Sequence, residues 1–330
     1  MAAPDKFKGT ATAHEAAEAI GSACWELDVD CSEVPMADGG DGLLDILGGA
    51  NRSTVVTGPL GDTVTAEWRL SRETAVIEMA RASGLVLAGG KENNDPLDAT
   101  TTGTGELIDH ALDAGAKRII VGLGGSATTD GGFGCIRAIS AISRLKQVEL
   151  LVACDVNTLF VDAAEVFAPQ KGATRAQVKM LTRRLERLAQ MFVEDFDVDV
   201  TQIVGGGAAG GLGGALAALG GKLLPGFELV ADEVDLFDHL QGADLVITGE
   251  GQLDDTSLDG KVIGGLENLT AELGIPLVAI VGAADHELVE ELDGRIDVMV
   301  LSDLYGLDLA MSQPKRCIGL AVTEVLQRFI

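Results

Sequence analysis

The sequence predicts an α/β protein made of two α/β domains, the second a mixed α/β domain inserted into the first. Short apolar runs alternate with amphipathic segments along most of the 330 residues, which is the pattern of repeated β-loop-α units with helices on both faces of parallel sheets. Three consecutive short runs break this alternation and indicate an antiparallel meander. A composition of 47% hydrophobic but only 4% aromatic residues, with 43 glycines, suits helices that lie close to a sheet and many tight turns.

The first part of the chain contains a strand, a glycine-rich loop and the meander. We expect a strand over Cys31–Pro35, then the loop MADGGDG and a short helix from Leu43. The three runs of the meander lie near residues 54–57, 64–70 and 75–79, with Gly-Pro and Arg-Glu between them.

The rest of the chain returns to alternating helices and strands. We expect helices over residues 104–114, after Gly131, over 174–192 and over 316–329, and buried strands over 118–121, 150–153, 245–248, 277–281 and 298–301.

The domain boundaries follow from where the meander begins and where the parallel pattern resumes. We place the first domain at residues 1–55 together with 245–330, and the inserted domain at residues 56–244. No repeat, low-complexity tail or linker marks these boundaries more sharply.

The charge of the chain limits its partners. It carries 51 Asp and Glu against 24 Lys and Arg, a net charge of −27. Such a charge repels nucleic acid and anionic lipid, so we expect neither as a partner. It would also repel an anionic substrate, and a site for ATP therefore needs local cations, metal ions or backbone N–H groups.

The cysteines and the apolar segments indicate where the protein works. The five cysteines are scattered and form no CxxC pair, which favours buried thiols in a reducing compartment over disulfides or a zinc site. Neither a signal-peptide pattern nor an apolar stretch of membrane-spanning length is visible. We therefore expect a cytoplasmic protein, and the sequence leaves open whether it forms a homo-oligomer.

Acid-bearing, mostly glycine-rich loops follow five of the predicted strands. In an open parallel sheet the ligand crevice lies at the carboxyl ends of the strands. Glycines there let backbone amides approach a phosphate, and carboxylates suit Mg²⁺ or a base that accepts a hydroxyl proton. One such loop alone is more simply a turn with an Asx hydrogen bond, but five together favour a phosphate-handling site. The loops are DGGDG after Val34, GLGGSATTDGG after Val121, Cys154-Asp155 after Val152, TGEGQLD after Val246, and Gly282 with Asp285 after Val281.

The common nucleotide motifs do not explain these loops. A P-loop is excluded, because no Gly-Lys pair is followed by Ser or Thr: Gly221-Lys222, for example, precedes Leu223, and Gly260-Lys261 precedes Val262. Gly205, Gly207 and Gly210 fit GxGxxG, but they lie in the glycine-dense string GGGAAGGLGG, where the match is weak. Tight packing or a nucleotide-facing helix start explains these glycines as well.

Seven long strings, in one order from the N-terminus to Lys261, resemble the motifs of the bacterial type 1 glycerate kinase family. The resemblance implies two α/β domains, one flavodoxin-like with a parallel sheet, and an active site in the cleft between them. It implies transfer of the γ-phosphoryl group of ATP to a hydroxyl of D-glycerate, with ATP and Mg²⁺ as cofactors and phosphoglycerate and ADP as products. The strings are APDKFKGT, PMADGGDG, TTGTGELI, GLGGSATTDGG, FAPQKGAT, GGGAAGGLGG and TGEGQLDDTSLDGK.

The resemblance also implies roles for residues of these strings, and each role has a simpler structural alternative. For Lys6, Lys8 and Lys171 the alternative is a solvated side chain, and for Asp38 and Asp41 it is an Asx turn. For Ser126, Thr128 and Asp130 the alternative is a helix cap, and for Glu250, Asp254 and Lys261 it is ordinary loop and helix-start electrostatics. The implied roles are catalysis for Asp130, Asp41 and Lys8; substrate binding for Asp5, Lys6, Ser126, Thr128 and Lys171; cofactor binding for Gly124, Gly125, Thr102, Gly206, Gly207 and Lys261; and metal binding for Asp38, Glu250 and Asp254.

Three departures from the family pattern keep a second function open. Family members have a short apolar strand before APDKFKG, where this chain has two residues, so we expect Asp5, Lys6 and Lys8 to lack a supporting strand. The segment over residues 132–150 is compressed, and the loop after Asp155 lacks the family's Asn-Pro-Leu pattern. The alternative is therefore a catalytically impaired relative that binds a metabolite or a nucleotide.

Overall fold

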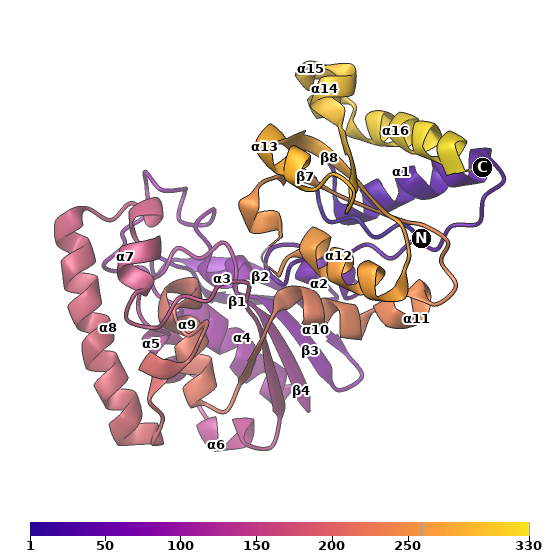
Figure 1. Cartoon of the computed structure of the whole chain (residues 1–330). Helices are drawn as coiled ribbons and strands as arrows, with labels where there is room; N and C mark the ends of the chain where they lie inside the picture. Colours follow the sequence, from indigo (N-terminus) through magenta and orange to yellow (C-terminus); the bar gives the residue numbers. More distant parts are fainter. Residues whose placement is uncertain (259, 330) are drawn as a thin grey trace. The chain divides into compact units, whose positions relative to one another are not determined.

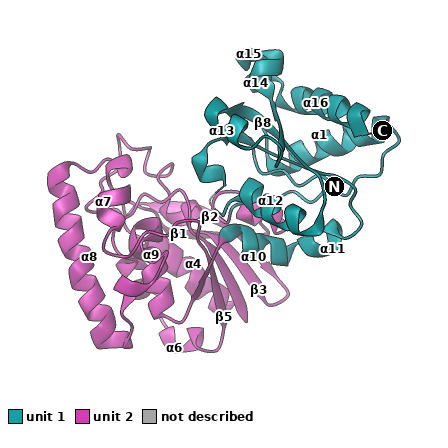
Figure 2. Ribbon diagram, viewed as in Figure 1, with its two compact units in different colours: residues 1–38, 226–330 teal, residues 39–225 magenta. Residues whose placement is uncertain are grey.

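The computed structural model describes residues 1–258 and 260–329, and the chain forms two compact units (Figures 1 and 2). Unit 1 comprises Met1–Asp38 and Gly226–Ile330, and unit 2 comprises Gly39–Pro225. Asp259, in the last of the seven strings, lies outside the described residues. Each unit combines a sheet with helices, which confirms the α/β class.

The boundaries of the units lie earlier in the chain than the expected domain boundaries. A boundary after residue 55 would cut β1 (Arg52–Thr57), which pairs along its length with β2 (Thr63–Ser71) in unit 2. The stretch before residue 245 forms α10 (Gly226–Glu233) and α11 (Leu236–Leu240) of unit 1, where α10 contacts α12 (Val262–Leu273). Strand pairing and helix packing therefore decide the boundaries, and neither leaves a composition signal in the sequence.

Unit 1 is built on a parallel sheet. The strands β7 (Val246–Leu253), β8 (Leu277–Ala284) and β9 (Asp297–Val300) lie in this order and are parallel. Beyond β7 the sheet continues through residues 1–5 and then residues 32–36. In chain order the five segments lie as 2-1-3-4-5, which is the flavodoxin-like order that the resemblance implied.

Residues 1–5 work as a strand although they are few. Ala3 N donates to Ile247 O and Asp5 N to Gly249 O, both at 2.8 Å. On the other side, Met36 N donates to Pro4 O at 2.9 Å. The expectation that Asp5 lacks a supporting strand is therefore wrong: alternate backbone groups of this segment bond to the segments on either side.

The helices of unit 1 cover its sheet and bury an aliphatic core. α1 (Ala13–Glu26) begins with a capping box, in which Thr12 Oγ1 accepts from Glu15 N and Glu15 accepts from Thr12 N. Its buried face packs against α16 (Pro314–Phe329) and the sheet. The shorter helices are η3 (Asp255–Ser257), α13 (His286–Glu291), α14 (Leu301–Tyr305) and α15 (Leu307–Ser312).

Unit 2 contains a six-stranded mixed sheet in the order β1 to β6. β1, β2 and β3 (Thr74–Glu78) are antiparallel neighbours, which confirms the meander. From β3 onward the strands are parallel, through β4 (Arg118–Gly122), β5 (Glu149–Ala153) and β6 (Lys222–Leu224). The carboxyl ends of β4 and β5 therefore present their following loops at the same edge of the sheet.

Unit 2 has three longer helices: α4 (Thr102–Asp113) and α9 (Ala208–Ala218) contact the sheet, and α8 (Arg175–Phe196) packs against α9. Their buried residues belong to one large core. α8 begins with a capping box between Thr174 and Gln177 and extends beyond the expected end. The compressed segment after β4 still forms two short helices before β5. The remaining helices are α2 (Leu43–Ile46), α3 (Ala80–Ser83), α5 (Phe133–Ala138), α6 (Ile142–Leu145), α7 (Ala163–Phe167), η1 (Pro169–Lys171) and η2 (Val200–Gln202).

None of the helices in the described part of the chain has both the length and the apolar character that crossing a bilayer requires.

Candidate active site

Unit 1 gathers acidic residues where its neighbouring strands end. Asp5 closes the segment 1–5, Asp38 follows the segment 32–36, and Glu250 lies on β7. Because segment 1–5 lies between segment 32–36 and β7, the three carboxylates share one edge of the sheet. In the 2-1-3-4-5 arrangement, the crevice between the first and third segments is where ligands bind.

Lys6 connects two of these acids. Its Nζ lies 3.8 Å from Asp5 Oδ1 and 3.8 Å from Asp38 Oδ1, and its backbone N donates to Asp5 Oδ1 at 2.6 Å. Asp5 is 6% exposed. Lys6 therefore has carboxylate partners, and the alternative of a merely solvated lysine does not apply to it.

Burial changes the proton affinity of two acids in this cluster. It raises the pKa of Asp5 to about 6, although Lys6 and Lys261 oppose the shift. It also raises the pKa of Glu250 to about 7, with a hydrogen bond from Ser257 lowering it and the charge of Asp5 raising it further. The two acids thus titrate near neutral pH, where a group can both accept and release a proton.

The loop after β7 brings a cation to this cluster. Lys261, directly before α12, donates from Nζ to Thr256 Oγ1 at 2.9 Å, and its charge lowers the pKa of Asp5, Glu250 and Asp254. The backbone N–H groups of the first turn of α12 add partial positive charge beside it. A phosphate group is the kind of ligand that this end of α12 favours.

The acids of unit 1 differ in their freedom to bind a metal ion. Glu250 Oε1 is buried without a hydrogen-bond partner, whereas Asp254 Oδ1 accepts from Thr256 N at 2.9 Å and from Thr256 Oγ1 at 2.6 Å. In the described residues, no group of three or more His, Cys, Asp or Glu side chains is arranged to hold a metal ion. Mg²⁺ in phosphoryl transfer usually needs only one or two carboxylates besides phosphates and water, and Glu250 fits that requirement.

Lys8 lies in a tight turn of unit 1. Phe7 N donates to Ala11 O and Thr10 N to Phe7 O, both at 2.8 Å, and Gly9 has a positive φ of 82°. The Lys8 side chain is exposed. The turn holds the backbone of this segment but leaves the side chain of Lys8 in solvent.

In unit 2, the loop after β4 packs against the DGGDG loop. A Cβ atom on Gly124 would lie 2.9 Å from Gly40 Cα, so glycine is required where the two loops meet. Asp41 is exposed in this second loop. The buried Glu78 anchors the DGGDG loop, because its Oε1 accepts from Gly42 N and Leu44 N, both at 2.9 Å.

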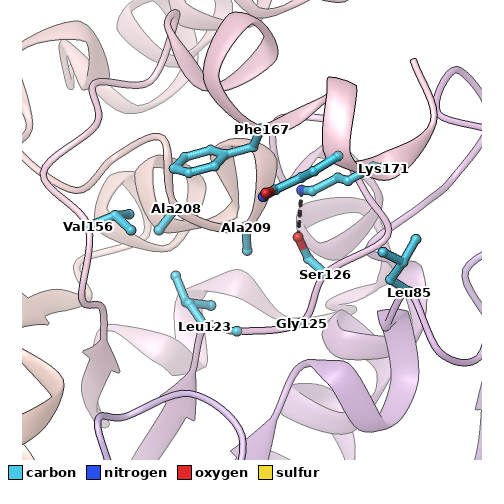
Figure 3. Close-up of a pocket in the computed structure, with 11 residues that line it drawn as sticks. Leu85, Leu123, Gly125, Ser126, Val156, Phe167, Lys171, Ala208 and Ala209 are labelled. Carbon is cyan, nitrogen blue, oxygen red and sulfur yellow. Dashed lines mark hydrogen bonds between the residues drawn. The ribbon is translucent and has the colours of Figure 1, made fainter. Parts of the chain in front are cut away.

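A cavity of about 330 Å³ opens beside the loop after β4 (Figure 3). Its walls are mostly apolar, but Lys171 and Ser126 face each other on one side. Lys171 Nζ donates to Ser126 Oγ and to Thr128 O, both at 2.6 Å. The other lining residues are Leu85, Leu123, Gly124, Gly125, Val156, Phe167, Gln170, Ala208 and Ala209.

The ammonium group of Lys171 is buried in an unusual way. The side chain is 4% exposed, and its two hydrogen-bond partners are a hydroxyl and a carbonyl rather than a carboxylate. Burial lowers the pKa of Lys171 to about 7, and Asp130 opposes the shift from farther away. An anion entering the cavity would supply the negative charge that this amine lacks.

Asp130 has a different environment from the acids of unit 1. Its Oδ2 accepts from Thr101 N at 2.9 Å, Thr101 Oγ1 at 2.8 Å and Gly134 N at 3.1 Å, while Oδ1 accepts from Gly132 N at 3.0 Å. These four bonds tie the starts of α4 and α5 to the loop after β4. The geometry therefore gives Asp130 the helix-capping role that we named as its structural alternative.

The sequence of this chain is matched by the model of the glycerate kinase family over residues 1–143 and 140–329. The chain belongs to the glycerate kinase family. It is 40% identical to glycerate kinase from Halalkalibacterium halodurans, over 94% of this chain and 93% of the relative. It is also 40% identical to glycerate 2-kinase from Escherichia coli, over 93% of this chain and 92% of the relative. The crystal structure of a Salmonella typhimurium LT2 protein assigned as glycerate kinase 2 matches at 35% identity with a TM-score of 0.83, covering 99% of this chain and 97% of that chain.

Within this member of the glycerate kinase family, the expected cofactor residues of unit 2 separate into three groups. Gly124 and Gly125 line the cavity of Figure 3. Thr102 lines a second cavity of about 410 Å³, together with Asp130. Gly206 and Gly207 line neither; a Cβ on Gly207 would lie 2.5 Å from Leu159 O, which indicates tight packing.

Thr128 and Ala209 meet at the edge of the cavity. Thr128 Oγ1 donates to Ala209 O at 3.4 Å, and Ala209 has left-handed backbone angles (φ 51°, ψ 39°) at the start of α9. Such a conformation is costly for a residue with a Cβ, and strained residues concentrate at functional sites. Ala208 and Ala209, rather than the preceding glycines, are the residues of the glycine-dense string that reach the cavity.

Glu78 is the site-supporting residue that sequence reasoning missed. It is 2% exposed at the end of β3, pairs with Arg81 Nε at 3.0 Å, and anchors the loop that carries Asp41. A signal was present: a lone glutamate stands inside the apolar run Val76-Ile77-Glu78-Met79. A charged residue in a buried strand needs partners, and so marks a polar anchor.

Proposed function

We propose that this chain is an ATP-dependent glycerate kinase, which transfers the γ-phosphoryl group of ATP to a hydroxyl of D-glycerate. Membership of the glycerate kinase family supports this activity, as do the relatives that match nearly the whole chain. The observation in the structure that carries it is the cluster of the buried Asp5 and the half-buried Glu250 with Lys6 and Lys261. Such a cluster offers oxygen ligands, a base and cations together, which phosphoryl transfer requires.

We assign the chemistry of the transfer to unit 1. Asp5 is proposed to accept the proton of the attacking hydroxyl, because its raised pKa still leaves it largely ionised at neutral pH. Glu250 and Asp38 would hold Mg²⁺, which, when bound, offsets the negative charge of the phosphate oxygens. Lys261 and the first turn of α12 would bind phosphate oxygens.

We assign binding of an anionic group to the cavity of unit 2. Lys171 and Ser126 are proposed to contact the carboxylate of glycerate, because the buried amine lacks a carboxylate partner. The glycine backbone of Gly124 and Gly125 and the apolar walls suit part of the nucleotide. Asp41, exposed in the adjoining loop, remains a proposed catalytic residue.

One of the expected departures that favoured a catalytically impaired relative, the missing supporting strand, is not found in the structure. The segment 1–5 positions Asp5 and Lys6 as a strand would. The compression that we expected for residues 132–150 is the remaining reason for the alternative, although this segment connects β4 to a parallel β5. A relative of this kind would bind ATP or glycerate without releasing ADP.

An assay of ADP release over a panel of small hydroxy acids tests the proposal. With ATP and Mg²⁺, we expect ADP release above the no-enzyme control with D-glycerate, and weaker release with L-glycerate, glycolate or lactate. The E. coli relative is a glycerate 2-kinase, so phosphorus NMR is expected to show 2-phosphoglycerate. Saturable binding in calorimetry with no ADP release would contradict the kinase proposal and favour the alternative.

A further inference from the structure

A tight turn at the end of α1 reverses the chain in unit 1. Val29 N donates to Cys24 O at 3.0 Å and Asp28 N to Trp25 O at 3.1 Å, which is the hydrogen-bond pattern of a Schellman motif. Asp28 takes the left-handed conformation that this motif needs, with φ of 58°. The chain therefore turns back toward the helix it has just left.

The turn places a second cysteine beside the helix end. Cys31 lies between the turn and Ser32, whose carbonyl accepts from Ala2 N at 2.8 Å, so both sides of Cys31 are held by backbone bonds. Its Sγ donates to Ser32 O at 3.9 Å, and a hydrogen-bond interaction with the Cys24 thiol is the main cause of opposite pKa shifts in the two cysteines. The spacing of six residues between the two cysteines is not a CxxC pattern, and the pairing was invisible in the sequence.

The two thiols line a cavity of unit 1 of about 570 Å³. Cys24 is 3% exposed, whereas Cys31 is only partly buried. The cavity is also lined by Ser32 and by His239, whose Nδ1 lies 2.9 Å from Ser32 Oγ. Of the two thiols that line the cavity, Cys31 is therefore the more accessible to a small polar molecule.

The hydrogen bond makes the two thiols chemically different. It lowers the pKa of Cys31 to about 7, against the effect of burial, because the thiol of Cys24 donates to the Cys31 sulfur. The same hydrogen bond, together with burial, raises the pKa of Cys24. Cys31 is thus the better nucleophile of the pair, since the thiolate is the reactive form.

We propose that Cys24 and Cys31 form a thiol modification site, at which a hydroperoxide oxidises the pair to a reversible disulfide. The Cys31 thiolate attacks one oxygen of the hydroperoxide, so that an S–O bond forms as the O–O bond breaks and an alcohol or water leaves. Cys24 sulfur then attacks the sulfenic acid of Cys31: the S–S bond forms, the S–O bond breaks, and the Cys24 proton leaves with the hydroxide as water. Two thiols are oxidised and one peroxide is reduced.

The other three cysteines provide an internal comparison. Cys135, Cys154 and Cys317 are buried, and burial raises the pKa of each thiol. A raised pKa and poor access both slow oxidation. We therefore expect peroxide to oxidise two of the five thiols together and to leave the other three as free thiols.

Peptide mapping after mild hydrogen peroxide treatment of the full chain tests this proposal. We expect a linked peptide joining Cys24 to Cys31, loss of two free thiols by colorimetric titration, and recovery of both with dithiothreitol. Oxidation of Cys31 to sulfinic acid with no linked peptide would overturn it, as would equal loss of all five thiols.

Variants separate the attacking thiol from the resolving one. In Cys24→Ser, which keeps a hydrogen-bond donor, we expect a sulfenic acid at Cys31 that dimedone traps. The wild type should give little of this adduct, and Cys31→Ser none. Cys317→Ala, a buried cysteine of the same unit, should form the linked peptide as the wild type does. A dimedone adduct at Cys24 in Cys31→Ser would contradict the assignment of Cys31 as the attacking thiol.

Discussion

The strand-end acids of unit 1 and the glycine loop of unit 2 look alike in sequence but differ in what their acids do. Glu250 is half-buried, its Oε1 atom is buried without a hydrogen-bond partner, and its pKa is raised to about 7. Asp130 is more deeply buried, yet four donors surround it. An acid in a glycine-rich loop is therefore available for chemistry only where neighbouring donors have not already bound it.

The largest expected effect is on turnover in unit 1. For Asp5→Asn and Glu250→Gln, we expect kcat to fall by about 10²-fold or more, because proton acceptance and metal binding are lost. Melting temperatures should change little, since neutral amides remove buried charges without new volume. Glu272→Gln, an exposed acid on α12, is the matched control and should keep wild-type kcat. Turnover within about threefold of wild type in both variants would refute the assignment of chemistry to this cluster.

The next effect concerns the cavity of unit 2. For Lys171→Met, we expect KM for glycerate to rise about tenfold or more, because a hydrogen bond to a charged group contributes roughly 1.5–3 kcal/mol. Steady-state kinetics with each substrate varied separately provides the measurement, with Lys179→Met on the exposed face of α8 as the control. A rise in KM for ATP alone would contradict this assignment and indicate that Lys171 binds the nucleotide.

Asp130→Asn should separate stability from chemistry. We expect the free energy of unfolding to fall by about 2 kcal/mol or more, because an amide oxygen cannot replace a carboxylate that accepts four hydrogen bonds. Urea unfolding measures this, with the exposed Asp195→Asn as the control. Full stability combined with lost turnover would restore the catalytic role that the resemblance implied for Asp130.

The pH dependence of stability should have opposite signs in the two units. Asp5 and Glu250 have raised pKa values when folded, so the folded state binds more protons and stability falls as pH rises from about 4 to about 7. Lys171 has a lowered pKa, about 7 against 10.5, so the unfolded state binds more protons and stability rises with pH across that interval. Urea unfolding at a series of pH values should show the acid slope weakened in Glu250→Gln and the alkaline slope weakened in Lys171→Met. Unchanged slopes in both variants would contradict these pKa shifts.

Much of the fold could be predicted from the sequence, because its strands are apolar runs bounded by turn residues. The antiparallel meander and the parallel strands β4, β5, β7 and β8 follow from periodicity. The role of residues 1–5 could not be predicted, because a five-residue segment containing Pro4 and Asp5 has no strand pattern of its own. Its neighbours on both sides supply the hydrogen bonds that make it part of a sheet.

The site could be predicted only as a set of loops. The sequence placed Lys171 beside a substrate but left open that it is solvated, and only packing shows that the side chain is 4% exposed. The sequence grouped Asp130 with the other acids. The four donors that surround it come from two helix starts and a loop, and only the folded chain brings them together. Glu78 was overlooked although a charge within an apolar run was visible.

The pH profile of kcat/KM for glycerate phosphorylation is the sharpest test of proton acceptance by Asp5. We assign this role to Asp5, whose pKa is raised to about 6. Wild-type activity should therefore rise with pH through an ascending limb near pH 6, and this limb should be absent from the residual activity of Asp5→Asn. An ascending limb of the same midpoint in both proteins would contradict the account.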